Sequence, residues 1–196
     1  MPCSARLAIV IFILAIKATT VSAQEMTLEL DPTKTTIEFT LSATLHTVHG
    51  TFALKSGTIH FNPETKAASG LVVVDATSAK SGNDGRDRKM HKDILESQRY
   101  PEITFAPTGF AGKMSSSGAS EVKLDGIFRL HGADHPMTLT LPVQMSGDSI
   151  SSKTHMVVPY IAWGLKSPNT LFLHVGDTVE IDIASSGQLQ YPAGKP

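Results

Sequence analysis

Histidine and aspartate residues are the best candidates for chemistry in this 196-residue chain. His131, Asp134 and His135 stand around a predicted hairpin turn, which could bring their side chains together. Neutral imidazole and carboxylate groups are typical zinc ligands, so this trio could form the metal site of a hydrolase. In the alternative interpretation they cap turns and hydrogen-bond to the backbone, and the sequence favours this structural role.

The other histidines give weaker signals. His46 and His49 are three residues apart, so on a regular strand they point to opposite faces and could share a metal only within a loop. The chain has no G-x-S-x-G elbow, no H-E-x-x-H motif, no phosphate-cradling glycine loop and no G-x-G-x-x-G opening a helix. The sequence therefore predicts no catalytic residue, no metal site and no cofactor.

Four further residues could serve either structure or function. Arg86 and Asp87 stand near the start of a predicted helix, where Asp87 would complement the helix dipole and Arg86 could tie the helix to a strand. Their alternative role is a polar clamp on a ligand head group. His91 follows Asp87 by four residues, which favours a surface pair over a proton relay. The lone tryptophan, Trp163, would either fill the core or form a wall that touches a ligand.

These residues must be held mainly by β-strands. Apolar and polar residues alternate with period two along most of the chain, a pattern typical of half-buried strands. Residues 70–75 are instead continuously apolar, which predicts cover on both faces, with the helix as the second cover. Periodicity alone allows either two packed sheets or one sheet closed on itself. The strand segments are residues 36–42, 57–61, 70–75, 103–105, 122–130, 137–143 and 179–183.

The spacing of apolar residues changes between the strand segment 70–75 and the strand segment 103–105. Met90 and Ile94 are four residues apart, a spacing that places them on one helix face. Asn83 supplies a start signal, and Tyr100 followed by Pro101 supplies a stop. The pattern predicts one short helix over about 83–96, with its apolar stripe on the mouth or flank of the sheet.

Several short motifs in this stretch and around it carry a family resemblance. They are Val48-His49-Gly50-Thr51-Phe52, Gly82-Asn83, Arg86-Asp87, Met90-His91-Lys92, Leu95-Glu96-Ser97, Tyr100-Pro101-Glu102-Ile103-Thr104-Phe105, Leu130-His131-Gly132, His135-Pro136-Met137-Thr138-Leu139, and Trp163-Gly164-Leu165-Lys166 with Pro168. Their order and spacing, from about Leu30 to Ser185, resemble the YceI-like family of secreted bacterial barrels. The resemblance implies an eight-stranded antiparallel lipocalin-like barrel that binds a polyisoprenoid lipid.

The sequence also departs from that family's pattern. Many members have Phe-Phe-Asp after the helix and Asp-Phe-Gly near the end of the chain. This chain has Ile94-Leu95-Glu96 and Ala162-Trp163-Gly164 at those places. The departures indicate a subfamily whose lumen is shaped differently.

The apolar faces of such a barrel are the predicted ligand site. The interior of eight strands is just wide enough to be filled by side chains or to hold one slender ligand. Each buried methylene contributes about 0.8 kcal/mol, so burial of about ten carbons would give ~8 kcal/mol. The residues predicted to border the ligand are Ile37, Phe39, Leu41, Val72, Val74, Met90, Ile94, Ile103, Phe105, Phe128, Leu130, Leu139 and Trp163. Ordinary core packing is the alternative for the same residues.

The chain ends indicate export. Arg6, the apolar run 7–16 and Val21-Ser22-Ala23 form a predicted secretory signal over residues 1–23, cleaved after Ala23. The barrel domain would span residues 24–186 and a flexible tail 187–196. The only cysteine, Cys3, would be removed with the signal, so the mature protein could form no disulfide.

The net charge of the predicted mature chain limits the classes of partner that it could bind. Without Arg6 and Lys17, 15 basic residues stand against 18 acidic ones, a net charge of −3. This balance argues against nucleic acid and anionic membrane surfaces, and favours an uncharged ligand or one held by apolar contact.

The sequence therefore predicts an all-β periplasmic or secreted binding protein that carries or sequesters a long apolar chain such as a polyisoprenoid. It predicts no stable membrane insertion, and a homodimer is compatible with it. The two alternatives are a metal-dependent hydrolase that uses His131, Asp134 and His135, and a ligand-free, stress-related structural barrel.

Overall fold

The computed structural model describes residues 25–44, 46–169 and 174–192, so the predicted signal segment lies outside the described residues. Its strands are β1 Met26–Leu30, β2 Thr36–Leu41, β3 Val48–Phe61, β4 Ala68–Lys80, β5 Glu102–Gly112, β6 Gly118–Leu130, β7 Ala133–Ser146, β8 Ser149–Val158 and β9 Val179–Gln190. Within these residues no helix is both long enough and apolar enough to cross a membrane.

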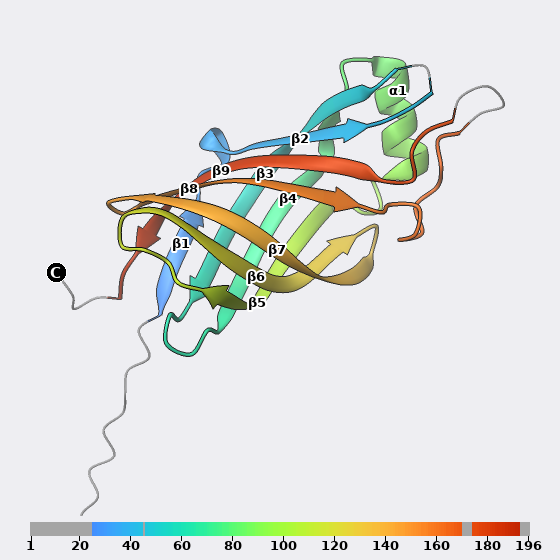
Figure 1. Ribbon diagram of the computed structural model, residues 1–196. Coiled ribbons are helices and arrows are strands. Elements are labelled where there is room, and N and C mark those ends of the chain that lie inside the picture. The colour runs from blue at the N-terminus through green and yellow to red at the C-terminus, as the bar shows by residue number, and fades with distance from the viewer. Residues whose placement is uncertain (1–24, 45, 170–173, 193–196) are drawn as a thin grey trace, which may run out of the picture.

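Strands β2 to β9 form a closed antiparallel barrel (Figure 1). From β3 to β9 each strand pairs with the next along the chain, and β2 lies between β3 and β9 and closes the ring. Every one of the eight strands pairs with a neighbour on both sides along at least part of its length, which reduces the free edges that antiparallel sheets otherwise have to protect. The predicted eight-stranded barrel is confirmed.

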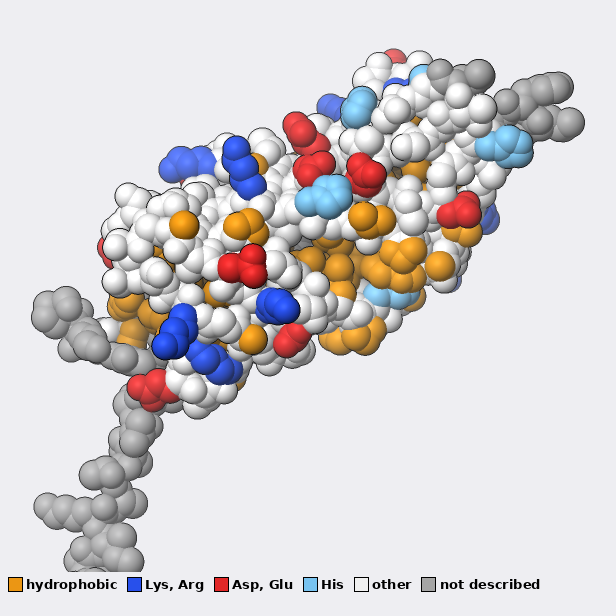
Figure 2. All heavy atoms as spheres, viewed as in Figure 1, with side chains coloured by type: hydrophobic (Ala, Val, Ile, Leu, Met, Phe, Trp, Pro, Cys, Tyr) orange, Lys and Arg blue, Asp and Glu red, His pale blue; other side chains and the backbone are white. Residues whose placement is uncertain are grey.

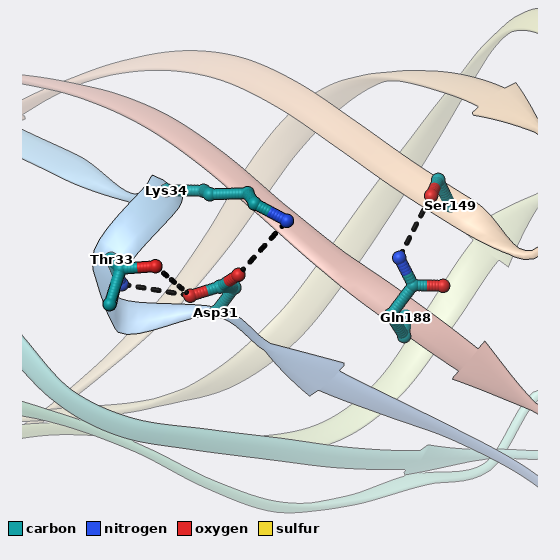
Figure 3. A network of polar contacts seen from close by, with 5 residues as sticks. All are labelled: Asp31, Thr33, Lys34, Ser149 and Gln188. Atoms are coloured by element: carbon teal, nitrogen blue, oxygen red, sulfur yellow. Dashed lines mark hydrogen bonds and ion pairs between the residues drawn. The ribbon is translucent and has the colours of Figure 1, made fainter.

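Strand β1 occupies the same gap between β3 and β9, beyond the start of β2. A 3-10 turn, η1 Pro32–Lys34, separates the two strands. Asp31 caps this turn, because its carboxylate accepts hydrogen bonds from Thr33 N at 2.9 Å and Thr33 Oγ1 at 2.6 Å (Figure 3). Lys34 Nζ lies 3.3 Å from the same carboxylate.

The last strand is longer than the sequence predicts. β9 runs to Gln190 and pairs with β1 over residues 187–190, so these residues belong to the sheet and not to the flexible tail expected from residue 187. Leu189 is buried in the core, and Gln188 Nε2 donates to Ser149 Oγ at 2.9 Å (Figure 3). Pairing with β1 satisfies the backbone hydrogen-bonding groups of these residues. The hydrophobicity pattern alone gives no signal for this pairing.

Side chains fill only the half of the barrel next to β1, which we call the packed half. Phe61 and Phe110 meet there edge to face, with ring centroids 5.7 Å apart. The buried members of this cluster are Ile59, Phe61, Ala68, Phe105, Phe110, Val122, Leu124, Val143, Met145, Ile150 and Leu189. The opposite half is hollow.

The barrel wall has a seam between β7 and β8. These strands pair only next to their hairpin, over residues 143–146 and 149–152. Residues 133–142 and 153–158, all of them described, form no pairs with each other, and the two strands diverge in Figure 1. Hydrophobic side chains gather on this face in Figure 2. Buried Tyr160 and Leu165, which follow β8, pack against β7 and β8 side chains in a second apolar cluster.

The helix lies at the end of the barrel opposite β1 (Figure 1). It consists of α1 Asp84–Lys89 and a wider π-helical turn, η2 Met90–Ile94, in which Leu95 N donates to Met90 O. Asn83 caps its start by accepting from Arg86 N at 2.9 Å. The predicted helix is confirmed, but the continuous apolar run of β4 is not covered throughout on its outer face: Leu71 remains 44% exposed, whereas Val73 is buried.

Candidate ligand-binding cavity

An apolar cavity of about 610 Å³ occupies the hollow half, beneath the helix. Its volume is within the range of small-molecule binding sites. The predicted site residues that line it are Ile37, Phe39, Leu41, Val74, Met90, Ile94, Ile103, Phe128, Leu130 and Arg86.

Strand alternation builds the cavity wall. On β2, Ile37, Phe39 and Leu41 face inward, because every second side chain of a strand points to the same face. On β9, Ile181 and Ile183 stand opposite Phe39 and Ile37. Further lining residues that the sequence analysis did not select as ligand-binding include Val48, Phe52, Met156, Val158, Tyr160 and Leu165. Some of them alternate with polar residues as clearly as the selected ones do, so the sequence pattern could have identified them.

A glycine makes room for one aromatic wall residue. Gly50 pairs with Phe39, and a Cβ atom at Gly50 would lie 2.3 Å from Phe39 Cζ. The ring of Phe39 therefore rests on the backbone of Gly50, and its centroid is 5.4 Å from that of Phe52. This contact gives Gly50 a structural reason to be glycine.

Four of the predicted lining residues lie elsewhere. Val72 and Phe105 belong to the core cluster of the packed half, and Leu139 packs against both this cluster and the second one. Trp163 does not line the cavity; its ring stacks on His135 at 3.9 Å and lies 5.6 Å from Phe128. Alternation identifies which residues face inward, but it does not say at which depth of the barrel they lie.

His91 ties the helix to β4. Its Nε2 lies 2.9 Å from Ala79 O and its Nδ1 3.0 Å from Ser97 Oγ. A carbonyl can only accept, so Nε2 carries the proton and Nδ1 accepts from the serine hydroxyl. The predicted surface pair of His91 with Asp87 is wrong, because Asp87 bonds to Ser81 instead.

Arg86 and Asp87 make a second tether through Ser81, directly after β4. Arg86 Nε donates to Ser81 Oγ at 2.6 Å, and its Nη2 donates to Ser81 O at 2.7 Å. Asp87 accepts from Ser81 N at 2.9 Å and from the Ser81 hydroxyl. Arg86 also lines the cavity, whereas Asp87 does not.

The trio considered for a metal site is dispersed. Asp134 accepts two hydrogen bonds from Arg129, at 2.6 and 2.8 Å, and these hold the pKa of its carboxyl below the usual range. The ring of His135 lies parallel to Trp163. In the parts of the chain that the structure describes, no group of three or more His, Cys, Asp or Glu side chains is placed to hold a metal ion.

His131 instead belongs to the turn between β6 and β7. It and Gly132 both have positive φ angles, 52° and 79°, as a tight two-residue hairpin requires. Tyr100 packs against this turn, with its ring centroid 4.4 Å from that of His131. The motif Leu130-His131-Gly132 therefore has a structural explanation.

A closed eight-stranded barrel with an apolar cavity under a short helix defines a lipocalin-like binding fold. A family model described as YceI-like domain matches residues 28–186, and the chain belongs to this family. A search of curated proteins found no match.

Solved structures share the fold. BcnA of Burkholderia cenocepacia has a TM-score of 0.65 and 17% identity, over 80% of this chain and 98% of its own. A polyisoprenoid binding domain from Saccharophagus degradans, implicated in plant cell wall breakdown, has a TM-score of 0.62 and 17% identity, over 83% and 98%. The Campylobacter jejuni YCEI protein has a TM-score of 0.51 and 17% identity, over 71% and 81%. At this identity the likeness establishes the fold.

Proposed function

We propose that this protein binds the apolar chain of a lipid, polyisoprenoid or related, inside its barrel and carries or sequesters it outside the cytoplasm. The observation that carries the proposal is the apolar cavity of about 610 Å³ at the helix end. Transfer of a hydrocarbon chain from water into such a cavity is favourable in proportion to the apolar area removed from water. The family membership and the predicted secretory signal support the same function, and we propose binding rather than catalysis.

The cavity volume sets the length of chain that it can hold. A methylene is about as large as a water molecule, whose share of liquid volume is about 30 Å³. A cavity of about 610 Å³ therefore accommodates roughly twenty carbons. We propose that a chain of about this length lies in the cavity, and that a longer polyisoprenoid extends out of the mouth.

The cavity is tested by filling it. Val74 lines the cavity, so Val74→Trp should block lipid uptake while the barrel still folds. Leu71→Trp is the matched control, because Leu71 lies on the same strand and is 44% exposed. Both variants and the wild type are expressed with their own signal and purified natively, and organic extracts are analysed by mass spectrometry.

We expect a lipid in the wild type and in Leu71→Trp, and a markedly smaller amount in Val74→Trp. Circular dichroism should show the same strand content in all three proteins. A full lipid load in folded Val74→Trp would contradict the proposed site. A wild type that carries no lipid and takes up none from added prenol would favour the ligand-free structural barrel.

A further inference from the structure

The seam between β7 and β8 has a cause in the sequence of β7. Both hairpins that bound this strand have two-residue turns, with Ala133 paired to Leu130 across the first and Ser146 to Ser149 across the second. Residues that flank such a turn form a hydrogen-bonded pair, and the direction of the backbone groups alternates along an antiparallel strand. The even-numbered residues of β7 therefore direct their backbone groups towards β8.

Two of these even-numbered residues are prolines. Pro136 and Pro142 have no N–H group, so β7 cannot donate a hydrogen bond to β8 at either position. Proline in a sheet is confined to edges and bulges, because elsewhere it removes a ladder hydrogen bond. The pairing of β7 with β8 ends at Val143, directly beside Pro142. The sequence of β7 therefore keeps this edge unpaired.

The inner face of β7 is open to solvent where the pairing stops. Val143 and Met145, in the paired part of the strand, are buried. Met137, Leu139 and Leu141 stand on the same inner face, but they are only partly buried. The seam thus exposes apolar side chains that point into the barrel.

Residues 159–165, which follow β8 and which we call the strap, close the wall beside the cavity. Tyr160 and Leu165 of the strap are each 5% exposed, and both line the cavity. They also belong to the apolar cluster against which Met137 and Leu139 of β7 pack. The strap therefore lies between the cavity and the seam.

The strap is fixed to the β8 side of the seam. Its backbone N–H groups bond within the strap, to Val158 O, and from Ile161 N to Asp177 O at 3.4 Å. The hydroxyl of Tyr160 donates to Gly176 O, which precedes β9, at 2.8 Å. Among the residues that the structure describes, no hydrogen bond joins the strap to β7.

Contact between the strap and β7 is made by side chains. The indole of Trp163 stacks on the imidazole of His135, with ring centroids 3.9 Å apart and ring planes within 6° of parallel. Nε2 of His135 is buried without a hydrogen-bond partner among the described residues, so this nitrogen adds no polar tie. The strap and β7 can therefore separate without loss of a backbone hydrogen bond between them.

We propose that the seam is a side entrance to the cavity and that the strap is its gate, so that the apolar chain of the lipid passes sideways between the strap and β7. This inference rests on the proposed function and adds the route of exchange to it. An end-first route would require the chain to thread past the helix at the mouth. Sideways passage instead brings the chain against the exposed apolar side chains of β7 along much of its length.

The test uses one pair of introduced cysteines both to loosen and to lock the gate. The only cysteine of the chain, Cys3, lies in the predicted signal, so His135→Cys with Trp163→Cys supplies the only two thiols of the mature protein. The two rings are stacked, so a short bismaleimide can bridge the thiols. Stopped-flow fluorescence measures uptake and release of anthraniloyl-labelled geranylgeraniol by delipidated protein, before and after bridging, and mass spectrometry verifies the bridge.

We expect the unbridged double variant to take up and release the probe about three- to tenfold faster than the wild type, because it lacks the aromatic stack that holds the gate closed. Bridging should slow both rates to about a tenth of the wild-type values or less. The equilibrium affinity should stay within about twofold, since a change of route alters both rates by the same factor and neither ring lines the cavity. Trp163→Leu alone should also speed both rates, so the test does not depend on the double variant.

Two further pairs serve as controls. Gln144→Cys with Ser151→Cys joins exposed register partners in the part of β7 and β8 that is paired, and its bridge should leave both rates unchanged. His46→Cys with Lys89→Cys joins two residues that line the cavity beside the helix. A bridge between them restrains the mouth and should leave both rates unchanged as well.

Rates that do not fall when His135→Cys and Trp163→Cys are bridged would overturn the side entrance and leave the proposed function intact. The same conclusion follows if bridging the mouth stops exchange. A bridge that slows release alone and so tightens binding would act on the bound lipid rather than on its route, which also counts against the gate. A wild type that binds no probe and carries no lipid would instead overturn the proposed function itself.

Discussion

At the scale of single residues, two phenylalanines with the same pattern have different surroundings. Phe39 and Phe105 both face inward from strands and are both buried, 5% and 7% exposed. Phe105 lies in the filled core cluster of the packed half, whereas Phe39 lines the cavity. Their substitution therefore measures two different things: the creation of a cavity and the enlargement of one already present.

We expect Phe105→Ala to cost about 3–5 kcal/mol of unfolding free energy, because it leaves a new void in a filled core. Phe39→Ala should cost less than Phe105→Ala in the lipid-free protein, since the space beside its ring is already empty. Urea denaturation of delipidated protein measures both. A larger loss for Phe39→Ala would mean that its contacts with Gly50 and Phe52 outweigh the effect of the cavity.

The depth at which an inward-facing residue lies in the barrel could not be predicted from the sequence. Val72 and Val74 are two residues apart on one strand and share its inward face, yet Val72 packs in the core and Val74 lines the cavity. Alternation has no signal for depth, which depends on strand register around the closed barrel. Arg86 could be assigned either a tether or a clamp from sequence, and the structure shows it tethered while also lining the cavity.

At the scale of elements, the helix is a cover held by side-chain hydrogen bonds as well as by apolar contacts of Ile94 and Leu95. Ser81 bonds to Arg86 and Asp87, and His91 bonds to Ala79 O and Ser97. Caps and spacing predicted the existence of this helix. They did not predict its π-helical turn, because the hydrogen bond from Leu95 N to Met90 O has no marker in the sequence.

Ser81→Ala should loosen this cover, because it removes the hydroxyl shared by Arg86 and Asp87. We expect faster amide hydrogen exchange over residues 84–95 and faster lipid dissociation, with global stability changed little. Ser149→Ala is the control, since Ser149 accepts a hydrogen bond from Gln188 at the opposite end of the barrel. If the two variants exchange and release lipid alike, the Ser81 contacts do not hold the cover in place.

At the scale of the whole molecule, one half of the barrel is filled by its own side chains and the other half contains the cavity. A lipid that binds only the folded state raises stability by mass action. We expect saturating lipid to raise the melting temperature of the wild type, and to raise that of Val74→Trp much less. Scanning calorimetry with and without lipid measures this difference, and an equal rise in both proteins would place the lipid outside the cavity.

The closure of the barrel could not be derived from periodicity, which allows a sandwich equally well, and the family resemblance decided it. The seam could not be foreseen at all. Residues 137–143 alternate in the sequence as regularly as the fully paired residues 122–130, and nothing in that alternation indicates that β7 leaves β8 after four pairs.

The seam has a consequence for how wide the barrel can become. In most closed barrels the circumference is set by backbone hydrogen bonds, which keep neighbouring strands about 4.8 Å apart. Between residues 133–142 and 153–158 that constraint is missing. On this side of the barrel Tyr160 and Leu165 belong to an apolar cluster that also includes side chains of β7 and β8. We therefore expect the circumference of the hollow half to change by rearrangement of side chains alone. If the cavity holds a lipid as proposed, a methyl-branched chain and a straight one, which differ in cross-section, should both fit within the same barrel.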